Sequence, residues 1–325
     1  LEALVANPEL FVDANIAHRV YLRAGKQVLQ WGRCTFWNPT DLINIEPVAF
    51  VPQVVNRGGT FGLKMHVPFG TVANIYGFID THNARTIQDP AGALRFEFLA
   101  GGSEIGISGW AKDDAQPVFG FDFSTGLPLK VGLVGEIGIS YGDNRSYIKK
   151  SGNLLSLQQR KDEWIPRICI GLDRKFDLGN YNDRIDLTTE FYYDFAGYQY
   201  NVFDRGGIYT YAEPVRISDT NSIPSGDIAT FYQAQGLYEP NKVGRYYLAV
   251  QTTISKFPIP DMSLRLGTLG NLQHGSYQVT GELTYATIHN LFASLLVLGR
   301  LGHRDSEYTF AGNATEAQIS MGLMF

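Results

Sequence analysis

Apolar and polar residues alternate along most of this chain. In RIDLTTEFYYDF, residues 184–195, the charged side chains all occupy even-numbered positions and most apolar side chains occupy odd-numbered ones. A period of two places successive side chains on opposite faces of a β-strand. The same rhythm occurs in LKVGLVGEIGISYG (129–142) and YQVTGELTY (277–285), and helical periodicity is almost absent. The pattern predicts an all-β protein.

Segment length separates two kinds of all-β protein. Strands of soluble sandwiches average about 5–6 residues, whereas a tilted membrane-spanning strand needs about 9–11. Several segments here reach ten or more residues, which favours membrane strands. We predict fifteen strands, at 9–17, 20–32, 57–67, 72–80, 93–100, 103–111, 117–124, 129–142, 163–176, 183–197, 245–256, 261–270, 276–288, 291–304 and 316–325.

The predicted connections alternate between short and long. Counting back from Phe325, every other connection is a tight turn, near residues 289, 259, 180, 126, 101, 69 and 18. The intervening connections are mostly longer and include 33–56, 81–92, 144–162 and 198–244. Short turns on one rim and long loops on the other are typical of an outer-membrane barrel. Aromatic residues near strand ends would form its interfacial girdles: Tyr141, Trp164, Tyr193 and Tyr246.

The strand count bears on the architecture. Bacterial single-chain barrels have even strand numbers, so we expect one ascending strand before the first one that we predict. Either LEALV at residues 1–5 is its remnant or it preceded residue 1. We therefore predict a transmembrane antiparallel up-and-down β-barrel of about 16 strands, with 14 and 18 as neighbouring values, short periplasmic turns and long extracellular loops. Residues 1–325 would form one barrel domain, either mature or trimmed at its N-terminus.

Composition excludes several other classes. The net charge of −5 and pI of about 5.7 give no basic footprint for nucleic acid. The longest apolar run, Leu291 to Gly299, is too short for a membrane-spanning helix, which needs about 20 residues. Cys34 and Cys169 could form at most one disulfide, and because one falls in a loop and the other within a strand we expect two thiols. No zinc-like ligand spacing is present, so we expect no metal and no cofactor.

The last predicted strand, in EAQISMGLMF, carries an apolar residue at every second position. Its pattern resembles the C-terminal signal by which the outer-membrane barrel assembly machinery recognises its clients. The residues that carry the resemblance are Ile319, Met321, Leu323 and Phe325. The resemblance implies an outer-membrane location and that machinery as a partner.

A second resemblance lies in LRAGKQVLQWGRCTFWNPTDLIN. This stretch resembles the Arg-x-Gly-x-Gln-x-x-x-Trp-Gly strand and Asn-Pro-x-Asp-Leu loop of porin-like outer-membrane proteins of the alginate-export type. The matching residues are Arg23, Gly25, Gln27, Trp31, Gly32, Asn38, Pro39, Asp41 and Leu42. TEFYYDFAGY and TLGNLQHGSYQVTGELTY also resemble later strands of that group. The resemblance implies a barrel transport protein more than it implies alginate export. An alginate exporter would be expected to have a strongly arginine-lined lumen, and none is evident in this sequence.

Charged residues would line the interior. An Arg or Lys facing lipid at the membrane midplane costs about 2–4 kcal/mol, so we place the strand charges inside. The predicted pore-lining residues are Arg23, Lys64, Arg95, Glu97, Asp122, Glu136, Arg167, Asp173, Arg184, Asp186, Glu190, Arg265, Glu282 and Arg300. Individually, any of them could instead pair with a neighbour and hold the wall. Together they indicate a wet, mixed-charge lumen, which a barrel of this size can enclose.

Two long loops are candidates for special roles. The 33–56 loop is apolar for an exposed loop, so it could fold inward as a constriction or form an ordered cap outside. Its constriction residues would be Trp37, Asn38, Pro39 and Asp41. The tyrosine-rich 198–244 loop suits surface recognition or partial plugging, with disorder as the alternative.

The sequence predicts a non-enzymatic outer-membrane porin that passes small hydrophilic solutes by diffusion. Outer-membrane lipid and lipopolysaccharide would surround it. The sequence leaves open whether it forms a homotrimer or binds a protein partner at its loops. A structural barrel that anchors a surface or periplasmic complex is the alternative. An outer-membrane hydrolase is the third, because three histidines and two carboxylates lie near predicted outer strand ends, although no nucleophile motif accompanies them; they are His82, His274, His303, Asp80 and Asp305.

Overall fold

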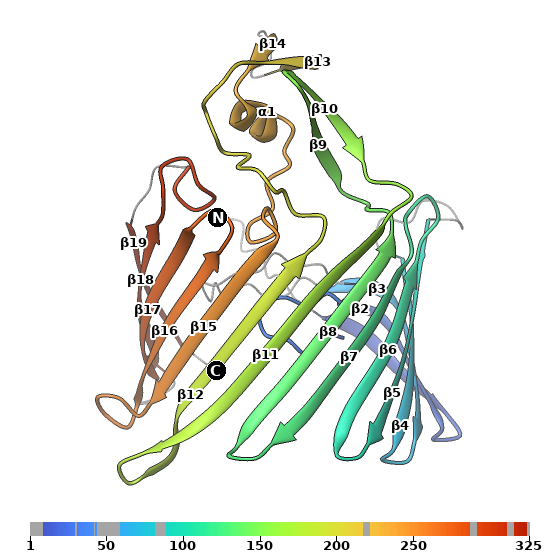
Figure 1. The fold of residues 1–325 in the computed structure, drawn as a ribbon. Helices are drawn as coiled ribbons and strands as arrows, with labels where there is room; N and C mark the ends of the chain where they lie inside the picture. Colours follow the sequence, from blue (N-terminus) through green and yellow to red (C-terminus); the bar gives the residue numbers. More distant parts are fainter. Residues whose placement is uncertain are drawn as a thin grey trace. The chain divides into compact units, whose positions relative to one another are not determined.

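The structure is a computed structural model. It describes residues 9–29, 31–41, 43, 59–81, 89–216, 222–286, 291–310 and 315–323. Fifteen of its strands form one sheet in the order β1-β2-β3-β4-β5-β6-β7-β8-β11-β12-β15-β16-β17-β18-β19 (Figure 1). The described residues contain no helix with the length and apolar character that crossing a membrane requires.

Each of the fifteen predicted strands is present, and most bounds agree to within three residues. The clearest difference is β2, which ends at Gln27 rather than at the predicted residue 32. Residues 28, 29 and 31–41 are not in a strand, because this stretch leaves the sheet and folds back onto it. The alternation in the sequence thus predicts the strands well but not where this one stops.

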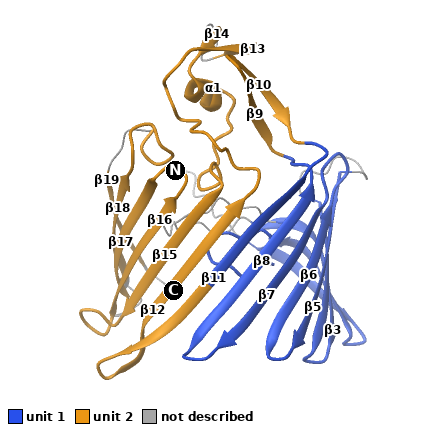
Figure 2. Ribbon diagram, in the orientation of Figure 1, with its two compact units in different colours: residues 1–144, 161–171 blue, residues 145–160, 172–325 orange. Residues whose placement is uncertain are grey.

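The chain divides into two compact units (Figure 2), residues 1–144 with 161–171 and residues 145–160 with 172–325. Unit 1 is an antiparallel meander joined by tight turns such as Gly101–Gly102. Its strands are β1 (Leu10–Ile16), β2 (Val20–Gln27), β3 (Thr60–Phe69), β4 (Ala73–Asp80), β5 (Ala91–Ala100), β6 (Ser103–Ala111), β7 (Val118–Leu127) and β8 (Val131–Tyr141). The long β11 (Trp164–Leu178) contributes its first half to unit 1 and its second half to unit 2.

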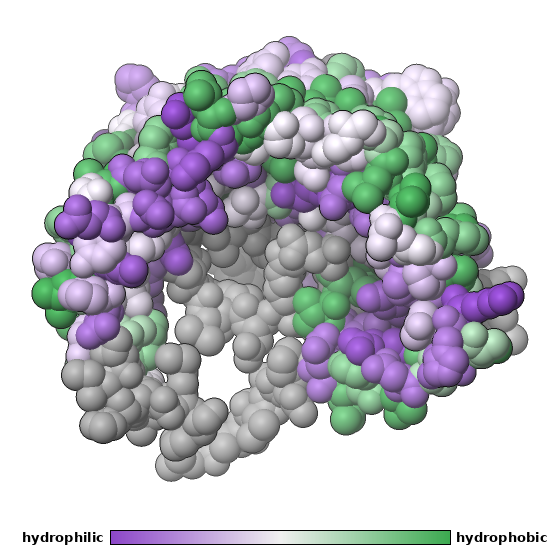
Figure 3. All heavy atoms as spheres, turned by 90° about the horizontal axis from the view of Figure 1, so that it is seen from below, coloured by the Kyte–Doolittle hydropathy of each residue, from purple (hydrophilic) through white to green (hydrophobic). Residues whose placement is uncertain are grey.

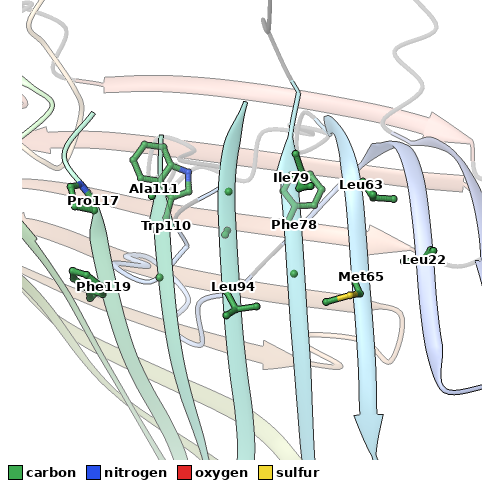
Figure 4. Close-up of a pocket in the computed structure, with 14 residues that line it drawn as sticks. Leu22, Leu63, Met65, Phe78, Ile79, Leu94, Trp110, Ala111, Pro117 and Phe119 are labelled. Atoms are coloured by element: carbon green, nitrogen blue, oxygen red, sulfur yellow. The ribbon is translucent and has the colours of Figure 1, made fainter. Parts of the chain in front are cut away.

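The two faces of the unit 1 sheet differ in polarity. Register partners Leu63 on β3 and Ile79 on β4 lie on an exposed face, which we call the apolar face. Glycines at positions 77, 92 and 109 leave a hollow of about 610 Å³ on this face, visible in Figure 4 between apolar side chains. The opposite face, which we call the polar face, carries the charges. In the view of Figure 3, hydrophobic and hydrophilic residues likewise gather in separate areas of the surface.

Unit 2 continues the alternation in a second antiparallel meander. Its strands are β12 (Tyr181–Asp194), β15 (Tyr246–Ser255), β16 (Met262–Asn271), β17 (Ser276–Ala286), β18 (Leu291–Leu301) and β19 (Thr315–Leu323). Phe191, Leu266 and Val297 are exposed on one face of these strands, which we call the apolar face of unit 2. The charged partners Arg265 and Glu282 lie on the other, the polar face of unit 2.

Unit 2 also contains a small folded subdomain built from the predicted loops 144–162 and 198–244. It consists of β9 (Ser146–Ser151), β10 (Leu154–Gln159), β13 (Tyr209–Arg216), β14 (Ser222–Gly226) and the helix α1 (Ile228–Ala234). Ile148, Leu155 and Phe203 are fully buried in its core. Asp227 caps α1 by accepting a hydrogen bond from the Thr230 amide at 2.6 Å. Its strands are short and lack sustained alternation, so the sequence pattern does not reveal them.

Candidate functional site

The segment 31–41, which follows β2, lies against the polar face of unit 1. Cys34, Trp37 and Thr40 are almost completely buried, at 1%, 2% and 0% exposure. Trp31 joins Phe78 and other apolar residues in a small cluster on the same face. A loop that buries this much apolar side chain is ordered by packing rather than by its own hydrogen bonds. We call it the docked segment.

Acidic residues from four neighbouring strands face the docked segment. One row of cross-strand partners contains Glu97 on β5, Gly106 on β6, Asp122 on β7 and Glu136 on β8. A side chain at Gly106 would meet Nη2 of Arg95 and a carboxylate oxygen of Asp122, each at 2.5 Å. The glycine therefore leaves the space in which guanidinium groups reach the carboxylates.

Arg33 enters this space from the docked segment. Its Nε donates to Asp122 at 2.5 Å, its Nη1 to Glu104 at 2.5 Å and its Nη2 to Glu97 at 3.0 Å. Arg95 donates to both oxygens of Asp122, at 2.5 and 2.8 Å. Because Asp122 is fully buried, these three charge-assisted hydrogen bonds from two arginines stabilise an ion that would otherwise be costly to desolvate.

Glu136 holds the backbone of the docked segment. Its carboxylate accepts hydrogen bonds from the amides of Arg33, Cys34 and Thr40, the last two at 2.6 and 3.2 Å, and from the Thr40 hydroxyl at 2.8 Å. One buried carboxylate thus satisfies three backbone donors that lie outside any ladder. These contacts fix both ends of the 33–40 stretch on β8.

Two strand glycines allow this close approach. A side chain at Gly138 would overlap the carbonyl oxygen of Pro39, and one at Gly120 would press on Thr40 at 3.1 Å. Both glycines belong to the row of register partners that contains Ser108. Glycine within a strand often marks such an approach of another backbone.

A polar cavity of about 320 Å³ lies beside the docked segment. Its lining residues are Val28, Leu29, Trp31, Gly32, Arg33, Lys64, Tyr76, Arg95 and Glu97. Lys64 makes no ion pair with any residue of the described ranges, and its Nζ lies 6.0 Å from the centre of the Tyr76 ring. The cavity therefore presents three cationic side chains against one carboxylate.

The structure brings four of the predicted pore-lining residues together in this network: Arg95, Glu97, Asp122 and Glu136. Lys64 lines the adjacent cavity. Others form separate pairs on the polar faces of their units, namely Arg23 with Asp13 at 2.8 Å, Arg167 with Asp143 at 2.8 Å, Arg265 with Glu282 at 3.0 Å and Arg300 with Glu316 at 2.7 Å.

The remaining predicted pore-lining residues, Asp173, Arg184, Asp186 and Glu190, belong to unit 2. Arg184 donates to two backbone carbonyls near the β15–β16 turn, at 3.1 and 2.7 Å. Asp186 and Glu190 alternate along β12 with the exposed Phe191, and Asp173 follows the exposed Leu172 on β11.

The predicted constriction residues belong to the docked segment. Trp37, Asn38 and Pro39 lie in it, and Asp41 ends it with its amide donating to the Asn38 carbonyl at 3.1 Å. Sequence reasoning missed Arg33 and Glu104 as members of the site. The signal available for the site was the set of glycines inside strands β6, β7 and β8, on the face that carries the charges.

A second polar cluster lies in unit 2 and was also missed. Glu307, in the connection between β18 and β19, is completely buried. Its carboxylate accepts from the Asn241 amide at 2.8 Å, the Tyr247 hydroxyl at 2.8 Å and Nδ2 of Asn271 at 2.7 Å. Burial raises the pKa of Glu307 to about 7 despite these donors.

The histidines of the hydrolase alternative have other neighbours. Nδ1 of His274 lies 3.4 Å from Nδ2 of Asn271, and the His303 carbonyl accepts from Ser306 at 2.8 Å. Asp80 accepts from the Thr60 hydroxyl at 2.8 Å, and Asp305 lies 3.7 Å from Arg205. His82 lies outside the described residues.

The predicted assembly signal is described in part. Ile319 and Met321 are exposed by 72% and 78% on one face of β19. Leu323 is the last residue of that strand, and Phe325 lies outside the described residues.

Known structures share this fold. OccAB1 of Acinetobacter baumannii matches 96% of this chain and 75% of its own with 10% identity and a TM-score of 0.52. The outer membrane protein OprD from Pseudomonas aeruginosa matches 95% and 75% with 11% identity and a TM-score of 0.50. Wzi of Escherichia coli, described as a carbohydrate-binding β-barrel involved in capsule assembly, matches 96% and 69% with 12% identity and a TM-score of 0.51.

These likenesses show the fold alone: the chain has the fold of porin-like outer-membrane β-barrels. The predicted all-β fold of long antiparallel up-and-down strands is confirmed. The sheet of the described residues has fifteen strands and shows no pairing that closes it, so the count of about 16 and the closure stay predictions. No protein-family model matches the chain, and no curated protein sequence matches it either.

Proposed function

We propose that this protein is an integral outer-membrane channel through which small hydrophilic solutes diffuse. The observation that carries the proposal is the docked segment on the polar face of unit 1, with an open polar cavity of about 320 Å³ beside it. A closed wall would need no such cavity. The porin-like fold and the exposed apolar face of each unit support placement in a membrane with lipid or lipopolysaccharide around it.

The lumen is of mixed charge in this proposal. Cations and carboxylates meet around Arg33, and the residues predicted to line the pore alternate with apolar residues along their strands. Opposed charges across a narrow aqueous passage create a transverse field that favours polar, hydrated solutes. The docked segment, with Trp37 to Asp41, is the proposed constriction.

Planar-bilayer recording tests the proposal. Purified wild-type protein is expected to show open, salt-dependent conductance. Lys64→Glu replaces a cavity cation that has no ion pair in the described residues with an anion, so the reversal potential in a salt gradient is expected to shift toward cation preference. Lys112→Glu, at an exposed position after β6, is the control and is expected to shift it little. A membrane-inserted protein that never conducts would overturn the proposal.

A barrel that holds a surface partner is the second candidate, and the folded subdomain of unit 2 favours it. Its aromatic core includes the stacked pairs Tyr147 with Tyr198 and Phe203 with Phe310, at 4.4 and 4.6 Å between ring centres. The likeness in fold to Wzi, a carbohydrate-binding barrel, adds to this candidate. A sealed barrel that copurifies with a defined complex, and loses it when residues 209–226 are replaced by a short linker, would favour anchoring over conduction.

The finer resemblance to the alginate-export group stays a prediction, as do the assembly signal and a homotrimer. Alginate oligomers and neutral oligosaccharides of equal length can be compared in liposome-swelling assays. Equal swelling rates for the two kinds of oligomer would favour a general channel over a specific alginate role.

A further inference from the structure

The two cysteines of the chain lie next to each other in unit 1. Cys34 belongs to the docked segment and Cys169 to the first half of β11. Their sulfur atoms lie within 4.8 Å, and their residues are 1% and 0% exposed. The structure holds both as thiols. Residues 135 positions apart have therefore been brought together by folding.

The contacts around Cys34 keep it in this place. Its amide donates to Glu136 at 2.6 Å, and the preceding residue is fixed by ion pairs to Asp122 and Glu104. Cys169 lies within a strand of the wall, so its backbone is fixed by the ladder. Neither cysteine needs to travel through solvent to reach the other.

To form a disulfide, the two sulfur atoms must approach from within 4.8 Å to bonding distance. The bond is about 2.05 Å long and joins Cα atoms about 4.4–6.8 Å apart. Rotation of two side chains about χ1 moves each sulfur by more than 1 Å, on the order of what closing the gap needs. Cys34 and Cys169 are the two cysteines of these 325 residues, so within them each can pair only with the other.

We propose that Cys34 and Cys169 form a disulfide that fastens the docked segment to β11. The inference rests on the proposed outer-membrane location, because a protein bound for that membrane crosses a compartment in which disulfides form and persist. The sequence alone favours two thiols, since it shows one in a loop and one in a strand. Their closeness in the fold changes that expectation.

The reaction balances with an oxidant of the envelope. A thiolate of one cysteine attacks the disulfide of a thiol–disulfide oxidoreductase, and a mixed disulfide forms as a protein thiolate leaves. The second cysteine then attacks the mixed disulfide, and the oxidoreductase departs as a dithiol. Two electrons pass to the oxidoreductase, and the sulfur–sulfur bond of the barrel is made. Since both side chains are buried in the folded unit, the bond forms while the docked segment is closing.

The consequence is a covalent constriction. The disulfide would close a loop of more than 130 residues, and cross-links of such loops constrain the unfolded chain strongly. Reduction is expected to raise the unfolding equilibrium constant by about 10²-fold. It would also leave the docked segment held by packing, hydrogen bonds and ion pairs, without a covalent link.

Mass spectrometry tests the bond directly. Outer membranes from cells quenched with acid are dissolved in denaturant and treated with N-ethylmaleimide, with or without prior reduction. The expected result is no adduct without reduction and two adducts after it. Proteolysis without reduction should yield a linked pair of peptides containing Cys34 and Cys169 from monomeric protein. Two adducts without reduction, or a disulfide between chains, would overturn the proposal.

Single variants separate this outcome from failure of the location. Cys34→Ser and Cys169→Ser should each take up one adduct without reduction, and both should reach the outer-membrane fraction with the heat-modifiable mobility of a folded barrel. If the wild-type protein is in the outer membrane and has two reactive thiols, the disulfide is refuted and the proposed location stands. Wild-type protein absent from that fraction refutes the location. Conductance plays no part in either readout.

Discussion

Removing Arg33 should release the docked segment from unit 1. The Arg33→Ala change deletes a side chain that is 13% exposed and that contacts Asp122, Glu104 and Glu97. Asp122 is fully buried and would keep Arg95 as its partner. The carboxylates of the cluster would then outnumber its cations by a wider margin.

The size of the effect follows from burial. Breaking a buried ion pair by removing one partner costs about 3–5 kcal/mol. Because Asp122 retains one of its two arginines, we take the lower end, about 3 kcal/mol. The contact with Glu104 adds little, since that carboxylate is 50% exposed and surface pairs contribute about 0–1 kcal/mol. A loss of about 3 kcal/mol raises the unfolded fraction by about 10²-fold.

Guanidinium titration of protein folded in detergent micelles measures this loss through tryptophan fluorescence. Two of the four tryptophans, Trp31 and Trp37, lie in the docked segment, so the signal reports on its environment. Arg23→Ala is the matched control. Its pair with Asp13 is 33% and 55% exposed, and the expected loss is below about 1 kcal/mol. If Arg33→Ala costs no more than Arg23→Ala, the ion-pair reasoning is wrong.

Three further predictions follow from single residues. Gly138→Val should displace the docked segment and raise channel conductance, because the new side chain would overlap a backbone carbonyl of that segment. Gly299→Val is the control, since a Cβ there would have no atom within 4 Å, and it should leave the conductance unchanged. Equal conductance of the two variants would contradict the docking. Between pH 4.5 and 7 the wild-type free energy of unfolding should fall by about 3 kcal/mol as Glu307 loses its proton, because its folded pKa of about 7 exceeds its reference value of 4.5. Glu307→Gln should abolish this pH dependence in denaturant titrations. A pH dependence that persists in the variant refutes its assignment to Glu307. Phe203→Ala should destabilise the subdomain by about 3–5 kcal/mol, which would be seen as faster proteolysis there. Ile208→Ala, at a position that is 78% exposed, should leave the rate of proteolysis unchanged. Equal cleavage rates in the two variants would count against a packed core.

The sequence by itself predicts all fifteen strands of the large sheet. The reason is local, because side-chain direction alternates along an extended backbone whatever the strand pairs with. Residues two positions apart share one face of a strand, so the polarity of these neighbours indicates which face of the sheet a residue occupies. Arg95 and Asp122 could therefore be placed on the charged face, although their partners could not.

The tertiary structure decided which charges meet. Arg33 reaches Glu136 across 103 positions of the chain and Asp122 across 89, and no local pattern encodes such a distance. It also decided that the 31–41 stretch docks on the wall, since that depends on glycines from three different strands lying in adjacent rows. The subdomain was hidden for the same reason: its β10–β13 pairing joins segments more than fifty residues apart. Periodicity reports the geometry of one strand, whereas a site is made from several.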